Sequence, residues 1–111
     1  MDKIDMNGFL KGIEGQVKTL AQQQLKQGTQ QVLDAVKSSL HDGKDDYQRW
    51  IGELASGDID KDGFESLARG QLDLAKMEAL KQAGLATVQV QSFVNGVIDI
   101  VVNAAFAAVK I

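Results

Sequence analysis

The sequence predicts a single all-α domain over residues 1–111, folded as a small four-helix bundle. Three observations support this prediction. Apolar residues recur at three- and four-residue steps along most of the chain, proline is absent, and glycines interrupt the pattern at intervals. Such recurrence gives each helix one apolar face, and the absence of proline leaves long helices unbroken.

The first helix is predicted over residues 3–41. Its apolar positions are Met6, Leu10, Ile13, Val17, Leu20, Val32, Val36 and Leu40. Gly8, Gly12 and Gly15 fall inside this pattern, and each interior glycine costs about 1 kcal/mol relative to alanine. Two explanations remain open for them, either close approach of another helix or fraying of the first turns.

A turn at His41-Asp42-Gly43-Lys44 is predicted to end this helix, because an Asp-Gly pair offers a residue suited to positive φ. A short second helix then runs to about Ser56, with Asp45 or Asp46 as its N-cap, and Gly57 ends it. Its apolar face consists of Tyr47, Trp50, Ile51 and Leu54.

Asp60 is predicted to cap a third helix that extends to about Ala83. Gly84 ends this helix, and Leu80 and Leu85 stand at the two positions that pack together in a Schellman motif. We therefore expect the chain to turn sharply here and to return antiparallel.

The last helix, predicted over residues 86–110, is the most apolar part of the chain, and its only charge before Lys110 is Asp99. Its polar residues Gln91, Asn95, Asp99 and Asn103 recur every four residues and draw one narrow stripe along the helix. This stripe is either the solvent-facing edge of the helix, or a polar layer that fixes register in a bundle or an oligomer, or a proton or ion site in a pore.

The function expected from these features is that of a non-enzymatic structural or protein-interaction bundle. A helix that is apolar around most of its circumference needs cover. A protein partner or a second copy in a homo-oligomer would provide that cover. The residues predicted to form this interface are Phe93, Val97, Asp99, Val101 and Phe106.

The alternative is a membrane-associated protein that inserts residues 84–109 as a helix, since the segment is long enough to span a bilayer. Asp99 opposes this alternative, because an aspartate at the centre of a span costs about 2.5–3.5 kcal/mol.

The segment Asp58-Ile59-Asp60-Lys61-Asp62-Gly63 matches the first half of a calcium loop. The twelfth position, where such loops place a bidentate glutamate, is Arg69. We therefore interpret the segment as the start of a helix and keep Asp58, Asp60 and Asp62 only as an incomplete set of cation ligands. His41 is the only histidine, so we expect no catalytic set, no metal site and no cofactor.

Composition excludes further classes of function. The chain has no cysteine, so it has no disulfide and no thiolate nucleophile. A net charge of −3 without a lysine or arginine cluster along the sequence argues against nucleic-acid binding. The first residues hold early acids and no apolar run, which predicts a cytoplasmic location. Export without a signal peptide is left open.

Overall fold

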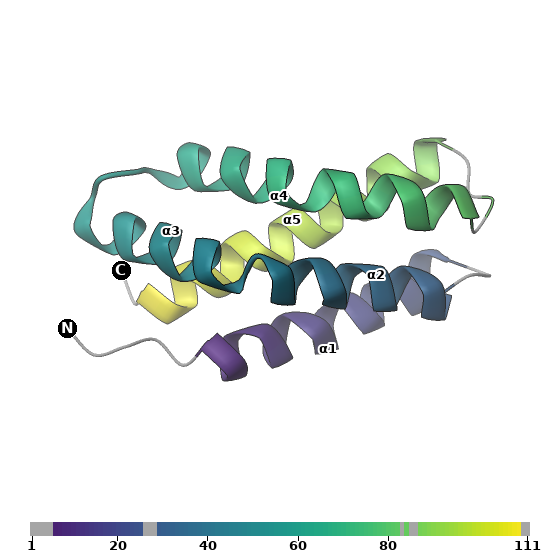
Figure 1. The fold of residues 1–111 in the computed structure, drawn as a ribbon, viewed down its shortest axis with the longest axis horizontal. Helices are drawn as coiled ribbons and strands as arrows, with labels where there is room; N and C mark the ends of the chain where they lie inside the picture. The colour runs from purple at the N-terminus through teal and green to yellow at the C-terminus, as the bar shows by residue number, and fades with distance from the viewer. Residues whose placement is uncertain (1–5, 26–28, 83, 85–86, 110–111) are drawn as a thin grey trace.

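A computed structural model describes residues 6–25, 29–82, 84 and 87–109 of this chain (Figure 1). The described residues form five helices and no strand, which confirms the all-α prediction. The helices are α1 (Met6–Gln24), α2 (Thr29–Asp42), α3 (Lys44–Ser56), α4 (Lys61–Gln82) and α5 (Thr87–Val109).

The helices lie lengthwise in an elongated body of 44 × 23 × 21 Å. In Figure 1, α2 runs back beside α1, α3 prolongs the line of α2, and α4 and α5 form a second antiparallel pair. The most extensive packing joins α1 to α5 and α2 to α4. The first and the last helix of the chain therefore pack against each other.

The prediction of one helix over residues 3–41 is wrong, because this stretch forms the two helices α1 and α2. A single helix of that length would place its whole apolar face along one line. By folding back, α1 and α2 bring their apolar faces together, so that Ile13 and Val17 of α1 and Val32 and Val36 of α2 enter one core. The described residues consequently form five helices rather than the predicted four.

The junction between α2 and α3 also differs from the expectation. Gly43 has φ −91° and ψ 9°, so the turn does not use positive φ. The Gly43 amide donates to the Ser39 carbonyl at 3.0 Å and the Tyr47 amide donates to the Gly43 carbonyl at 2.9 Å, which keeps helical spacing across the break. Gly43 itself is the N-cap of α3. Asp45 and Asp46 lie in the first turn, where their negative charges interact favourably with the helix dipole.

The ends of α3 and α4 follow the predicted local signals. Gly57 ends α3 at φ 83°, in the left-handed region, and the Asp58 amide donates to the Glu53 carbonyl at 2.8 Å, as in a Schellman motif. The Asp60 carboxylate accepts a hydrogen bond from the Gly63 amide at 2.8 Å. Asp60 is therefore the N-cap of α4, as predicted.

The connection between α4 and α5 contains a second left-handed glycine, Gly84, at φ 72°. This left-handed glycine confirms the predicted turn, and Figure 1 shows that α5 returns antiparallel to α4. The expected contact between Leu80 and Leu85 lies outside the described side chains.

One hydrophobic core runs through the bundle and receives side chains from every described helix. Its largest fully buried members are Tyr47 from α3, Phe64 from α4 and Phe93 from α5. Full burial of an aliphatic or phenyl side chain contributes about 1.5–3 kcal/mol. The core thus holds α5 against the other helices along most of its length.

Candidate functional site

The polar stripe of α5 faces solvent in the folded chain, where Gln91, Asn95, Asp99 and Asn103 are all exposed. The Asn95 side-chain carbonyl accepts a hydrogen bond from the Arg69 guanidinium of α4 at 2.9 Å. Within one chain the stripe is thus the outer edge of α5, tied at one point to α4, rather than a layer inside the core.

The five residues predicted to form an interface fall into two groups. Phe93, Val97 and Val101 have no exposed surface, because the chain's own helices cover them. Asp99 is exposed and Phe106 is half-buried. The first three are available to a second copy or to lipid only if α5 leaves the bundle, whereas the other two lie on the surface of the folded chain.

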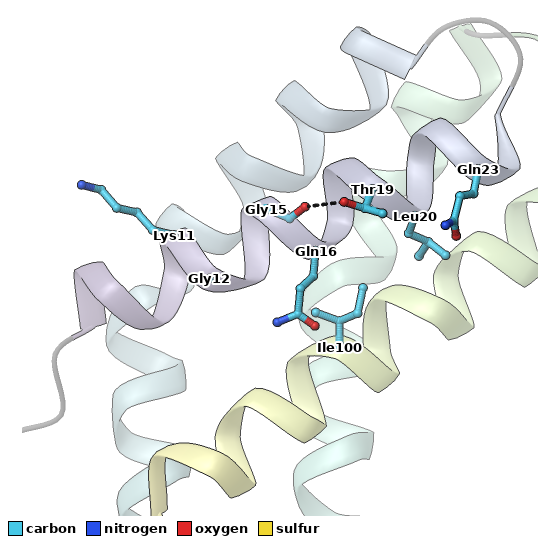
Figure 2. A pocket seen from close by; sticks show the side chains of 8 residues that line it. All are labelled: Lys11, Gly12, Gly15, Gln16, Thr19, Leu20, Gln23 and Ile100. Atoms are coloured by element: carbon cyan, nitrogen blue, oxygen red, sulfur yellow. Dashed lines mark hydrogen bonds between the residues drawn. The ribbon is translucent and has the colours of Figure 1, made fainter.

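A groove of about 630 Å³ lies between α1 and α5 (Figure 2). It is lined by Lys11, Gly12, Gly15, Gln16, Thr19, Leu20, Gln23 and Ile100. Leu20 and Ile100 are half-buried and pack against the core. In Figure 2 their side chains lie between the two helices, while the Lys11 side chain extends away from α5. The groove therefore combines an apolar strip with polar walls.

Gly12 and Gly15 form part of one wall of this groove, and their missing side chains serve no contact within the described structure. A Cβ atom added at either position would meet nothing within 4 Å. Gly96 of α5 behaves differently, because a Cβ there would lie 2.6 Å from Cδ2 of Leu20. Gly96 thus lets α1 and α5 approach, and Gly12 and Gly15 of α1 leave an open surface beside that contact.

A partly buried polar network links the α2–α3 junction to α4. The Tyr47 hydroxyl donates to Oε1 of Gln71 at 2.8 Å, and Nε2 of Gln71 donates to the Ser39 carbonyl at 2.7 Å. Burial, reinforced by the charge of Asp46, raises the pKa of the Tyr47 hydroxyl far above its usual range. The protonated hydroxyl of Tyr47 and the side-chain amide of Gln71 therefore keep their hydrogen-bond partners, and these bonds stabilise the fold.

This network was not predicted from the sequence, although the sequence holds a signal for it. Gln71 follows Phe64 and Ala68 at helical steps, so it lies on the inward face of α4. A glutamine at such a position needs a buried hydrogen-bond partner. Which partner it finds depends on the packing of α4 against α2 and α3.

The residues of the incomplete calcium loop form hydrogen bonds at the end of α3 and at the start of α4. The Asp58 carboxylate accepts from the Ser56 hydroxyl at 2.8 Å, and the Asp60 carboxylate caps α4. Arg69, at the twelfth position, pairs with Glu65 at 3.4 Å. Among the described residues, no group of three or more His, Asp or Glu side chains could hold a metal ion.

His41 lies exposed in the last turn of α2, and its Nε2 is 3.1 Å from a carboxylate oxygen of Glu14 in α1. In the next helix the Lys44 amine donates to the Asn7 side chain at 3.1 Å. Both contacts join the start of α1 to the region where α2 meets α3, and neither brings a nucleophile to the histidine.

Comparison with known proteins finds no family model, no curated protein and no solved structure that matches this chain. One described helical segment, Gln91–Val109, is long and apolar enough to cross a bilayer, and 33% of it is buried in the bundle. Because no known protein indicates a function, a functional proposal rests on the groove between α1 and α5 and on the apolar helix α5.

Proposed function

We propose that this protein is a non-enzymatic interaction module that self-associates along the face shared by α1 and α5. The observation that carries the proposal is the groove in which half-buried Leu20 and Ile100 lie beside the open glycine wall of Gly12 and Gly15. A second copy of the same face is the proposed occupant, in an isologous contact.

The glycines support this proposal energetically. Each costs about 1 kcal/mol in a helix interior, and no contact within the described structure offsets the cost of Gly12 or Gly15. A helix that approaches this wall from outside can come closer than side chains would allow elsewhere on α1. The contact would also remove the remaining exposed surface of Leu20 and Ile100 from water, which favours association.

Sedimentation equilibrium or light scattering tests the proposal at protein concentrations in the tens of micromolar. We expect the wild-type chain to form a discrete oligomer, and the variants Gly12→Leu and Gly15→Leu to shift towards monomer because their side chains fill the groove. Gly70→Leu is the matched control, since Gly70 is an exposed helical glycine of α4 with nothing within 4 Å of its Cβ position.

A wild-type chain that is monomeric throughout this concentration range contradicts the proposal. Equal weakening by Gly70→Leu would also contradict it, because a general effect of surface leucine would then explain the result. Circular dichroism of each variant shows whether the helices are retained.

The variant Asp99→Leu tests the role of the polar stripe separately. Unchanged assembly with equal or greater stability is expected if the stripe is only the outer edge of α5. Loss of a defined oligomer would instead assign a register role to the Asp99 carboxylate in the assembled state.

A second candidate function is membrane association through α5, favoured by the length and apolar composition of Gln91–Val109. Insertion requires α5 to leave the bundle, since Phe93 and Val97 are fully buried there. Flotation with neutral liposomes tests it. Insertion predicts flotation that increases in Asp99→Leu, because that variant removes the charge from the span. Absence of flotation for both proteins contradicts it.

A further inference from the structure

A second hollow, of about 240 Å³, lies between the first half of α1 and the C-terminal part of α2. It is lined by Asn7, Leu10, Lys11, Glu14, Lys37 and His41. Lys11 borders both this hollow and the α1–α5 groove, and Figure 2 shows its side chain extending away from α5. The hollow therefore adjoins the groove at Lys11, and its other lining residues differ from those of the groove.

The hollow is locally basic in a protein whose net charge is −3. Lys11, Lys37 and His41 face a single lining acid, Glu14, and that carboxylate already contacts Nε2 of His41 at 3.1 Å. Within the described part of the chain, neither lysine forms an ion pair or a hydrogen bond. Two exposed ammonium groups from different helices are thus left to attract an anion.

The surroundings strengthen this attraction. Leu10 is only 1% exposed and gives the hollow an apolar wall, beside which charges interact more strongly than in bulk water. Lys44 donates to the Asn7 side chain at 3.1 Å, which brings a third amine to the rim. Asp34, one turn before Lys37, accepts a hydrogen bond from Gln30 at 2.9 Å in a neighbouring hollow.

We propose that this hollow binds a phosphate group between Lys11 and Lys37. Lysine ammonium groups act as separate point charges and suit an oxyanion with several oxygens, whereas planar recognition of a carboxylate favours arginine, which does not line this hollow. Its volume of about 240 Å³ is below the roughly 300–1,000 Å³ of pockets for drug-sized ligands. One phosphate group fits this scale, from a soluble phosphate or from a lipid headgroup.

The first arm of the test titrates inorganic phosphate against chloride at constant ionic strength and follows the backbone amide resonances of α1 and α2. We expect shifts around the hollow that chloride does not reproduce. Lys11→Gln and Lys37→Gln should each weaken phosphate binding by about tenfold, equivalent to about 1.4 kcal/mol. Glu14→Gln should strengthen it, because the variant removes the opposing charge.

Lys61→Gln is the matched control, since Lys61 is an exposed lysine at the start of α4 and the variant changes net charge equally. The control should leave phosphate binding unchanged. Absence of phosphate-specific shifts, or equal weakening in Lys61→Gln, overturns the proposal, because binding would then be absent or would reflect net charge alone.

The second arm identifies the source of the phosphate by flotation with vesicles of phosphatidylcholine alone or mixed with phosphatidic acid. Flotation that requires phosphatidic acid and is lost in the Lys11→Gln/Lys37→Gln double variant assigns a lipid headgroup. Phosphate-specific shifts without flotation assign a soluble phosphate. Flotation that ignores both lysines, without phosphate-specific shifts, overturns the proposal and points to insertion of α5.

Discussion

Replacement of Gly43 by alanine is expected to destabilise the protein, although alanine lowers the conformational entropy of the unfolded chain. The φ of −91° at Gly43 is accessible to alanine, so the backbone is no obstacle. The obstacle is Gln71, whose Nε2 and Cδ lie 2.5 and 2.7 Å from the position of an added Cβ. The Gln71 amide must therefore move when Gly43 becomes alanine.

The size of the effect follows from the contacts that Gln71 would lose. Its amide pairs with the buried Tyr47 hydroxyl at 2.8 Å and with the Ser39 carbonyl at 2.7 Å. A buried polar group left without a partner costs about 1–3 kcal/mol, and disturbance of both bonds costs about 3 kcal/mol in total. Alanine also lowers the conformational entropy of the unfolded chain, which returns about 1 kcal/mol. We therefore expect Gly43→Ala to lower the free energy of unfolding by about 2 kcal/mol.

A double-mutant cycle with Gln71→Ala isolates this explanation. Gln71→Ala alone should destabilise the protein, because it leaves the Tyr47 hydroxyl unpaired. In that background Gly43→Ala should stabilise it by about 0.4–1 kcal/mol, since the obstacle is gone and only the lower conformational entropy of the unfolded chain remains. The effect of one substitution thus changes sign with the residue at position 71.

Urea denaturation measures each corner of the cycle through the fluorescence of Trp50, the single tryptophan, whose ring packs edge-on against Tyr47 at 5.4 Å. Equal slopes with denaturant show that the unfolded states are comparable. Stabilisation by Gly43→Ala while Gln71 is present would refute the reasoning, because it would mean that the Gln71 amide moves without loss.

Three further predictions concern single residues. Asp60→Ala should lower stability by about 1 kcal/mol through loss of the N-cap of α4, while Asp60→Ser should retain most of it in the same urea assay. Gly57→Ala should cost about 1–2 kcal/mol because it forces alanine into the left-handed region, whereas Gly52→Ala, at a helical position with open space around it, should stabilise by about 0.5–1 kcal/mol. The pKa of Tyr47 is raised in the folded state, so the unfolded chain loses this proton first, at about pH 10. Stability should therefore fall as pH rises above about 10, and thermal unfolding of Tyr47→Phe should show a smaller fall over that range.

The groove and the proposed phosphate-binding hollow could not be predicted from the sequence. Gly12 and Gly15 could be singled out from the sequence as costly residues inside a helix. The groove beside them, however, also contains Leu20 of the same helix and Ile100, which comes from the other end of the chain. Lys11 and Lys37 likewise form no cluster along the sequence. Both features arise because α1 packs against α5 and α2, and local patterns do not specify such pairings.

The sequence by itself determined the helical class, the end of α3, the start of α4 and the turn between α4 and α5. The signals at Gly57, Asp60 and Gly84 act on the backbone within a few residues, so their effects do not depend on the rest of the fold.

Only the tertiary structure decided how these helices cover one another. It divided residues 3–41 into two helices, because two short apolar faces bury each other and one long face does not. It covered Phe93, Val97 and Val101 with the chain's own helices, and it left Asp99 facing water. The physical reason is that burial depends on the neighbours that each face meets, and those neighbours are distant in sequence.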